Sequence, residues 1–482
     1  MNSKYEAVIG LEVHAQLLTD TKIFCGCANK FGFPPNTNIC PVCLGYPGVL
    51  PVLNQKVVEF SVLMGLATNC TINERSVFAR KNYFYPDLPK GYQTSQYEEP
   101  ICEHGKITIE FKDGSKKDIG ITRIHMEEDA GKSIHDQGSE TLIDVNRCGT
   151  PLIEIVSDPE MHSPEEAYLY LTKLKQILTY LKICDGNMEE GSLRCDANVS
   201  IRLKGETKFG TKAEVKNMNS FRNVEKAIEY EIERQIDTID EGGKIIQQTL
   251  LWNADLNKVM PMRSKEEAHD YRYFPDPDLM PVVVNEKWKD EIFLSMPELP
   301  DKRKYRFVEQ YSLPVYDSEI LTSSIQLADY YEKILSVTDD YKSASNWVMT
   351  DVLKVLNDQK ISIEQFSISP ENLGKLIKLI NEKTISGKIA KEVFSEMLKT
   401  NKDPDEIVKE KNLVLINDTA EIENVTDKIL AANPKQIEEF LSGKDKIIGF
   451  FVGQIMKEMK GKANPQIVND LLKTKLNKYK AT

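Results

Sequence analysis

The segment Tyr5-Glu-Ala-Val-Ile-Gly-Leu-Glu-Val-His-Ala-Gln-Leu17 decides how this chain begins to fold. Apolar and polar side chains alternate along it, which predicts a β-strand with one apolar and one polar face. Glu12 and His14 then share one face, and Leu11 and Val13 share the other. A carboxylate and an imidazole two residues apart suit a metal site or an acid–base pair. A solvated polar face is the simpler interpretation of this strand taken alone.

Strand signals continue from this segment to about Glu291. Residues 194–203 alternate in the same way, and Gly and turn residues are frequent. Helical periodicity interrupts the strands at residues 164–181 and 224–239, and Ser163-Pro164 supplies a cap and a first helical residue for the earlier helix. Strands with a few inserted helices predict an α+β body.

The stretch Met296-Pro-Glu-Leu-Pro-Asp301 marks a change of pattern. The sequence after it is almost entirely helical, with helices predicted at residues 302–311, 324–335, 343–356, 370–381 and 386–399. A last segment of short helices follows. We therefore predict a mixed α/β domain at residues 1–293, a helical domain at 294–402 and a small helical tail at 403–482.

Composition indicates a soluble protein of several domains. The chain has 482 residues and a net charge of −12, which argues against general nucleic-acid binding. From Gly443 onward, nine lysines face three acidic residues, a balance of +6 that leaves −18 for the remainder. This basic tail suits contact with phosphates, although a solvated lysine-rich helix explains it equally well. Neither a long apolar run nor a signal peptide is evident, so we expect a cytoplasmic protein without membrane contact.

Four cysteines, Cys25, Cys27, Cys40 and Cys43, follow the first strand with the spacing C-x-C-x12-C-x2-C. Two close pairs joined by a short loop have the ligand spacing of a tetrahedral zinc site. A site whose four ligands all come from the protein leaves no open position, so the predicted zinc is structural. Thiolates of this kind persist in a reducing compartment.

Two further segments carry acidic residues on predicted strands. Residues 121–131 bring His125, Glu127, Glu128 and Asp129 together, and Glu154 stands alone in the apolar run Pro151-Leu-Ile-Glu-Ile-Val156. A buried carboxylate must be paired, metal-bound or protonated. Oxygen ligands with one imidazole favour Mg²⁺ or Mn²⁺ over zinc, and Mg²⁺ usually accompanies phosphate chemistry. The alternative for Glu154 is a buried salt bridge to an arginine such as Arg123 or Arg147.

The familiar nucleotide and hydrolase motifs are missing from the sequence. It contains no P-loop, no dinucleotide-binding glycine motif, no G-x-S-x-G elbow and no H-E-x-x-H. Residues 78–92 and 216–222 instead combine aromatic and basic side chains. Such segments can stack a nucleobase and hold phosphates, or they can form packed aromatic clusters.

Several long motifs resemble the GatB family, the B subunits of the glutamyl/aspartyl-tRNA(Gln/Asn) amidotransferases. They include Ile9-Gly-Leu-Glu-Val-His14, the four cysteines, Arg80-Lys-Asn-Tyr-Phe-Tyr-Pro-Asp87, Thr122-Arg-Ile-His-Met-Glu-Glu-Asp-Ala-Gly131, Pro151-Leu-Ile-Glu-Ile-Val-Ser157, Gly186-Asn-Met-Glu-Glu-Gly-Ser-Leu-Arg-Cys-Asp-Ala-Asn198 and Tyr271-Arg-Tyr-Phe-Pro-Asp-Pro-Asp278. The resemblance covers essentially the whole chain. It implies an N-terminal catalytic "cradle", a helical domain and a helical tail that meets tRNA.

The resemblance also implies an activity. A protein of this family would use ATP to phosphorylate the side-chain carboxylate of Glu-tRNA(Gln) or Asp-tRNA(Asn), and ammonia from an amidase (glutaminase) partner would then displace phosphate. A small third protein would complete the heterotrimeric ligase. The absence of an amidase nucleophile from this sequence fits that division of labour.

Site residues follow from the same resemblance. The catalytic and Mg²⁺-binding set is Glu12, His14, Glu128 and Glu154, with Glu128 chosen over Glu127, and His14 could instead shuttle a proton from ammonia. The expected remaining contacts are Arg80, Lys81, Tyr83, Lys216 and Asn217 for ATP, and Lys457, Lys460, Lys462 and Lys473 for tRNA.

Two other interpretations stay open on the sequence. One is a non-catalytic, zinc-stabilised tRNA-binding protein of the same complex, whose carboxylates form only salt bridges. The other is a general ATP-dependent carboxylate–amine ligase for a small substrate, against which the basic tail and the large helical half argue.

Overall fold

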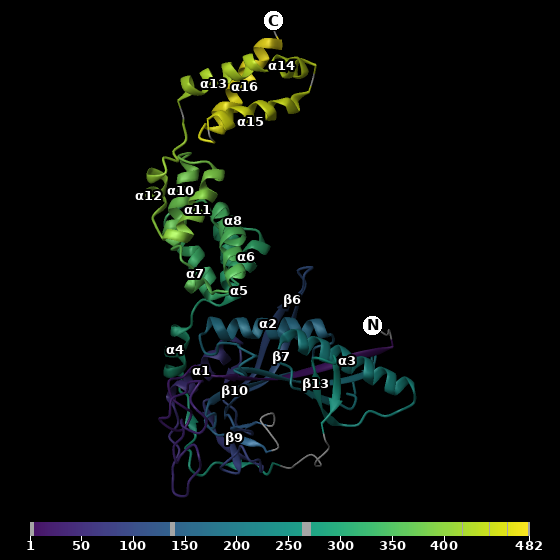
Figure 1. Ribbon diagram of the computed structural model, residues 1–482. Coiled ribbons are helices and arrows are strands. Elements are labelled where there is room, and N and C mark those ends of the chain that lie inside the picture. The colour runs from purple at the N-terminus through teal and green to yellow at the C-terminus, as the bar shows by residue number, and fades with distance from the viewer. Residues whose placement is uncertain are drawn as a thin grey trace. The chain divides into compact units, whose positions relative to one another are not determined.

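The computed structural model describes residues 4–134, 140–262, 271–416, 418–442, 444–459 and 461–480. The chain divides into two compact units, Met1–Pro300 and Asp301–Thr482 (Figure 1). The first is rich in strands and the second is helical, which confirms the predicted α+β class with a helical C-terminal part. Within the described residues, no helix is long and apolar enough to cross a bilayer.

The first unit is built on a nine-stranded sheet with β1 at its centre. The strand order is β14-β13-β12-β11-β1-β10-β7-β6-β2, and neighbouring strands are antiparallel except for β12 and β13. The strands of this sheet are β1 (Tyr5–Gln16), β2 (Thr71–Ile72), β6 (Cys102–Glu110), β7 (Lys116–Glu128), β10 (Pro151–Ser157), β11 (Leu193–Leu203), β12 (Ala213–Lys216), β13 (Gln248–Asn253) and β14 (Lys258–Pro261).

Among the described residues of this unit, three smaller sheets and four helices complete the fold. The small sheets pair β15 (Phe274–Pro275), β4 (Phe78–Asn82) and β5 (Tyr92–Gln96); β16 (Val282–Val283) and β3 (Arg75–Ser76); and β8 (Lys132–Ile134) and β9 (Leu142–Asp144). The helices are α1 (Gln55–Ala67), α2 (Pro164–Tyr180), α3 (Phe221–Asp240) and α4 (Glu286–Ser295).

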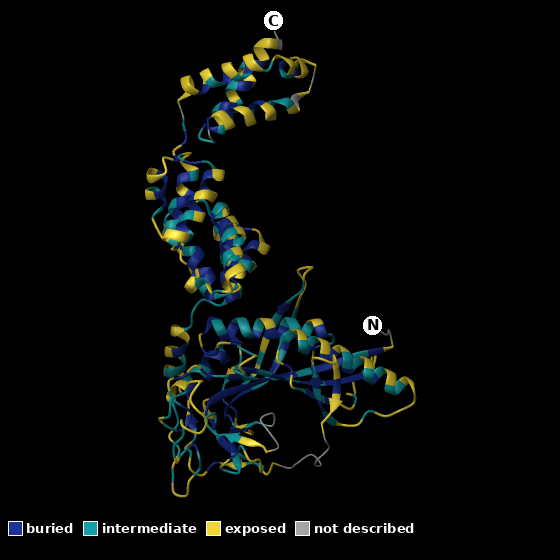
Figure 2. Cartoon of the chain, viewed as in Figure 1, coloured by how far each residue is buried: buried dark blue, intermediate teal, exposed yellow. Residues whose placement is uncertain are grey.

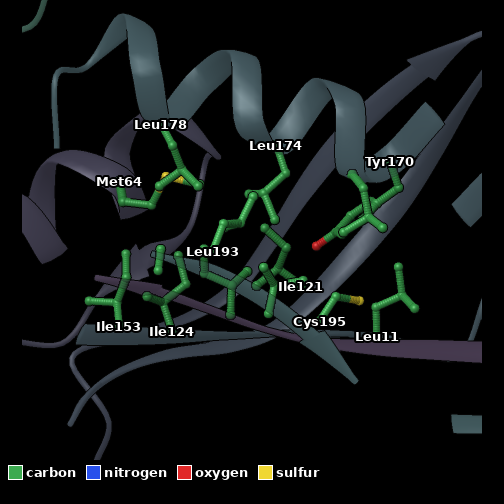
Figure 3. Packing of buried hydrophobic residues seen from close by; sticks show 14 of the residues in the cluster. Leu11, Met64, Ile121, Ile124, Ile153, Tyr170, Leu174, Leu178, Leu193 and Cys195 are labelled. Atoms are coloured by element: carbon green, nitrogen blue, oxygen red, sulfur yellow. The ribbon is translucent and has the colours of Figure 1, made fainter. Parts of the chain in front are cut away.

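One face of the nine-stranded sheet is apolar and lies under helices. Helix α2 starts at Pro164 as predicted, because the Ser163 hydroxyl accepts a hydrogen bond from the backbone N–H of Glu166 at 3.2 Å. Its buried Leu174 and Tyr170 point toward the strands (Figure 3). Each such large apolar side chain contributes about 2 kcal/mol when it is removed from water. The helices therefore cover one face and leave the alternating polar residues on the other.

In the described part of the second unit, the buried residues of the helices form two hydrophobic clusters (Figure 2). The predicted helix at 343–356 is interrupted by a π-helical turn, Val348–Val352. The predicted border at residue 403 falls before α12, whose Ile407 and Val408 belong to the first of these clusters. The helices are α5 (Pro300–Tyr311), α6 (Val315–Leu321), α7 (Ile325–Ile334), α8 (Tyr341–Trp347), α9 (Leu353–Gln359), α10 (Pro370–Asn381), α11 (Gly387–Thr400), α12 (Pro404–Glu410), α13 (Thr419–Ala432), α14 (Pro434–Leu441), α15 (Ile448–Glu458) and α16 (Pro465–Lys480).

Candidate active site

The polar face of the sheet carries a row of ionisable residues across three neighbouring strands. The register of β1, β10 and β7 places His14 opposite Glu154, and Glu154 opposite His125. Glu127 lies two residues after His125 on β7, so it shares their face. Three strands that are distant in sequence thus bring two imidazoles and two carboxylates together.

The four side chains are in direct contact. His14 Nε2 lies 3.4 Å from an oxygen of Glu154 and 3.8 Å from one of Glu127. His125 Nε2 lies 3.2 Å from each of the same two carboxylates. Glu127 and His125 are buried, Glu154 is 8% exposed, and His14 is half-buried. His14 is therefore the member of the cluster that a substrate can reach most easily.

Charge pairing dominates the protonation of this cluster. Burial opposes ionisation of Glu154, but His125 and His14 outweigh it and hold the pKa of Glu154 well below its usual range. Burial likewise opposes protonation of His125, but Glu154 and Glu127 raise the pKa of His125 to about 9. The pKa of His14 is raised and that of Glu127 is lowered for the same reasons. The carboxylates thus stay ionised.

Three of these residues have the geometry of a metal site. One ligand atom from each of His14, Glu127 and Glu154 lies within 4.8 Å of the others. Ser95 donates a hydrogen bond to Glu127 at 2.7 Å, and Gln93 donates one at 3.2 Å, so this carboxylate is held in place from β5. One imidazole with two carboxylates is a donor set that accepts Mg²⁺ or Mn²⁺.

Glu128, the predicted ligand, lies apart from this group. Its position on β7 has the opposite parity from Glu127, and its side chain is ion-paired with Lys90. It also accepts a hydrogen bond from the backbone N–H of Thr94 at 2.8 Å. The structure therefore groups Glu127, and not Glu128, with His14 and Glu154.

Glu12 belongs to a second carboxylate group on the same face. Its ligand atoms cluster with those of Asp196 on β11 and Glu214 on β12. The Lys216 ammonium lies between the latter two, 2.5 Å from Asp196 and 2.8 Å from Glu214. Asn198 donates a hydrogen bond to Glu12 at 2.9 Å. Burial, followed by the charges of Glu154 and Glu214, raises the pKa of Glu12.

The residues expected to bind ATP are distributed over several environments. Burial opposes protonation of Lys81, but the charges of Glu127 and Glu154 outweigh it and raise the pKa of Lys81. The Lys81 ammonium lies 4.9 Å from the centre of the Tyr271 ring. Tyr83 donates a hydrogen bond to Gln93 at 3.2 Å. These two residues therefore lie beside the carboxylate cluster.

Arg80 and Asn217 have other partners. Arg80 pairs with Asp276 at 3.0 Å and Asp278 at 2.7 Å and lies over the Tyr92 ring. Asn217 adopts a left-handed backbone conformation, with φ of +67°, and donates a hydrogen bond to the Trp252 carbonyl. Lys216, as described above, is already held by carboxylates.

The four cysteines come together as their spacing predicts. One sulfur from each of Cys25, Cys27, Cys40 and Cys43 lies within 4.8 Å of the others. The backbone N–H of Cys40 donates a hydrogen bond to the sulfur of Cys43 at 3.0 Å, an arrangement that orients a thiolate ligand. The donor set and the spacing fit a four-thiolate zinc site.

The basic tail presents exposed lysines. Lys457 on α15 and Lys473 on α16 are exposed, and Lys462 is half-buried. Over the described part of the chain, none of these three forms an ion pair, whereas Lys475 pairs with Glu423 and Asp427. Lys460 lies outside the described residues.

Comparison with known proteins identifies the family. The model of the GatB/GatE catalytic domain matches residues 7–290, and that of the GatB domain matches residues 329–476. The chain belongs to the GatB family. A relative in Chlorobium phaeobacteroides (strain BS1) is 58% identical over 473 residues, covering 98% of this chain and 99% of the relative. Another in Geobacter sulfurreducens is 58% identical over 476 residues, covering 98% and 99%. Both are named as the B subunit of aspartyl/glutamyl-tRNA(Asn/Gln) amidotransferase.

Two members of the central cluster were absent from the expected catalytic set of this GatB chain. His125 and Glu127 stand two residues apart on β7, so strand alternation already put them on a common face. The sequence did not show that β7 pairs with β10. That pairing sets His125 opposite Glu154.

Proposed function

We propose that this chain is the activating component of a tRNA-dependent amidotransferase. It would transfer the γ-phosphate of ATP to the side-chain carboxylate of Glu-tRNA(Gln), Asp-tRNA(Asn) or both. Ammonia would then replace the phosphate and give Gln-tRNA(Gln) or Asn-tRNA(Asn). The relatives' shared name supports this reaction. The observation that carries the proposal is the His14–Glu127–Glu154 group, which has ligands suited to a divalent cation on the polar face of the sheet.

In this proposal His14, Glu127 and Glu154 would hold Mg²⁺. When bound, it would neutralise charge between the γ-phosphate and the substrate carboxylate, two anions that otherwise repel each other. The Lys81 ammonium, which senses both carboxylates, would add positive charge at the same place. Ser95 and Gln93 would keep Glu127 in position through their hydrogen bonds. His14 has an alternative role, in which it accepts the proton that ammonia loses as the new C–N bond forms.

The proposed ATP contacts differ in how directly they can act. Lys81 and Tyr83 lie beside the cluster, so we assign them to the phosphate and nucleoside of ATP. Arg80 is ion-paired with Asp276, and Lys216 is ion-paired with Asp196 and Glu214. Asn217 donates a hydrogen bond to the Trp252 carbonyl. We propose that these three shape the walls of the cradle in the N-terminal unit.

We propose that the four cysteines hold one structural Zn²⁺. All four positions of a tetrahedral ion would be taken by thiolates, which leaves none for a substrate. Elemental analysis of protein purified under reducing conditions should therefore find about one zinc per chain. A metal-free preparation that retains full stability would contradict the assignment. A reducing compartment suits these thiolates, so we also propose a cytoplasmic location.

The other proteins of the complex and the tRNA are proposed partners. An amidase (glutaminase) would supply ammonia, a small third protein would join the two larger ones, and the tail would contact tRNA through Lys457, Lys460, Lys462 and Lys473. Replacing exposed Lys457 and Lys473 together by glutamate should weaken tRNA binding and flatten its salt dependence. The exposed Lys212→Glu variant of the first unit is the matched control. Equal tRNA affinity in both variants would remove the tail from the proposed contact.

The decisive experiment is ATP hydrolysis by the reconstituted complex, with and without Glu-tRNA(Gln). We expect strong stimulation by the misacylated tRNA, and we expect Glu154→Gln to abolish it while glutaminase activity persists. The control is Glu165→Gln, an exposed residue in the first turn of α2. Tight tRNA binding without any stimulation would instead favour a non-catalytic, tRNA-binding role.

A further inference from the structure

Lys22 is a buried cation beside the four cysteines. Only 1% of its surface is exposed, although lysine is among the residues least often buried. Its backbone N–H donates a hydrogen bond to the carbonyl of Cys27 at 2.9 Å, and its ammonium donates one to the carbonyl of Asn38 at 3.0 Å. Lys22 is thus hydrogen-bonded both to Cys27, the second residue of the first cysteine pair, and to Asn38, which lies two residues before the second pair.

The side chain of Lys22 runs close to the thiols. Gly149 packs between the two: a Cβ atom added there would lie 3.6 Å from Cys43 Cβ and 3.6 Å from Lys22 Cδ. Lys22 also lines one surface pocket together with Cys25 and Cys40. The sulfur of Cys43 accepts a hydrogen bond from the backbone N–H of Cys40 at 3.0 Å, so the Lys22 side chain lies beside an ordered thiol.

Among the residues that the structure describes, no carboxylate pairs with this ammonium. No carboxylate oxygen within the described ranges lies within 4.0 Å of the Lys22 nitrogen, and the Asn38 carbonyl offers only a dipole. Burying an unpaired charge is costly, so a compensating negative charge is expected nearby. Four thiolates around one divalent zinc would carry two negative charges in excess, and this excess would supply a counter-charge for Lys22.

We propose that Lys22 is the charge-balancing residue of the cysteine metal site. Its ammonium offsets part of the negative charge of the metal-loaded thiolates, and its hydrogen bond to Asn38 ties the two cysteine pairs together. The inference rests on the proposed zinc site. It adds a residue that binds no metal itself yet sets how tightly the metal is held.

Zinc affinity of the full-length chain tests this role. Zinc would be titrated against a colorimetric chelator for the wild type, Lys22→Met and Lys22→Gln. Both variants remove the charge, and Lys22→Gln keeps a donor that can reach toward the Asn38 carbonyl. We expect each to lower zinc affinity by about 10- to 100-fold. Cobalt-loaded variants should keep the wild-type thiolate-to-metal absorption bands, because the four ligands are unchanged.

Ile23→Ala is the matched control. Ile23 is the next residue, is fully buried and belongs to the main hydrophobic cluster, so its truncation weakens the same segment while the ammonium stays. We expect it to lower the thermal midpoint and to leave zinc affinity close to that of the wild type. If Ile23→Ala lost as much zinc affinity as the Lys22 variants, the effect of Lys22 would be one of packing and not of charge, which would overturn the proposal.

The remaining outcomes distinguish a failure of the Lys22 proposal from a failure of the proposed zinc site. Wild-type affinity in Lys22→Gln would mean that the hydrogen bond matters and the charge does not, which overturns the proposal. Should Lys22→Met fail to fold, Lys22→Gln alone decides it. Wild-type protein that binds no zinc would refute both the zinc site and the role of Lys22, whereas zinc-binding wild type with unaffected variants would refute Lys22 only.

Discussion

Two carboxylate groups share the polar face of one sheet, and they are balanced in different ways. In the first group, Glu127 and Glu154 contact the imidazoles of His14 and His125. In the second, which also contains Glu12, the Lys216 ammonium pairs with Asp196 and Glu214. An imidazole can lose its proton and become a metal ligand, but a lysine held by two carboxylates stays charged and occupies the space of a cation. The first group is therefore open to a divalent cation, and the second already contains its positive charge.

Two neighbouring glutamates of β7 give the sharpest test of which carboxylates bind the cation: Glu127 belongs to the first group, whereas Glu128 is paired with Lys90. Glu127→Gln should lower tRNA-dependent ATP hydrolysis by at least about a hundredfold, because it removes a proposed ligand charge. Glu128→Gln removes the partner of Lys90 and should cost clearly less in kcat at saturating Mg²⁺. Steady-state kinetics of the complex over a range of Mg²⁺ concentrations measures both. The reverse order of effects would return Glu128 to the metal site.

The stability of metal-free protein should depend on Glu154 in a defined pH range. The imidazoles lower the folded-state pKa of Glu154 despite burial, so its contribution is present above the unfolded value of about 4.5 and is lost as pH falls through the folded value. Glu154→Gln should thus lose about 2 kcal/mol at pH 7 and match wild type in strong acid. Urea unfolding in chelator at both pH values tests this. A constant difference across pH would contradict it.

Breaking the second group should affect stability less. Lys216→Met leaves Asp196, Glu214 and Glu12 to repel each other, and because the site is partly solvated we expect a cost of about 1 kcal/mol at pH 7. Protonation of the carboxylates should shrink this cost near pH 4. The exposed Lys212→Met serves as control in the same urea experiment. A larger loss at acid pH would rule out the charge-balancing role.

Glu12 should give the opposite sign from Glu154. Burial and the neighbouring Glu154 and Glu214 raise its folded-state pKa, so wild-type protein loses stability as pH rises from about 4.5 through that value. Glu12→Gln should consequently be more stable than wild type at pH 7.5, by roughly 0.5–1 kcal/mol, and equal to it near pH 4. Thermal midpoints in chelator, with exposed Glu98→Gln as control, check the sign. A destabilised Glu12→Gln at pH 7.5 would show that its bond from Asn198 outweighs repulsion.

Local pattern alone determined much of this protein. Alternation at residues 5–17 predicted β1, the Ser163-Pro164 pair predicted the start of α2, and the change of period after Met296 predicted the helical second unit. The cysteine spacing predicted the four-sulfur cluster. These features depend on neighbours a few residues apart, so the sequence carries them directly.

Tertiary structure decided which polar residues meet. His14 is more than a hundred residues from His125 and Glu154 in sequence, and no local pattern shows that β7 pairs with β10. Only the register of β1, β10 and β7 sets the three residues in one row. Strand alternation puts Glu127 and Glu128 on opposite faces, but only tertiary packing makes Lys90 and the Thr94 backbone the partners of Glu128. The burial of Lys22 likewise results from tertiary packing. A side chain's face follows from its strand's period, but its partners follow from strand order and register, which long-range packing alone selects.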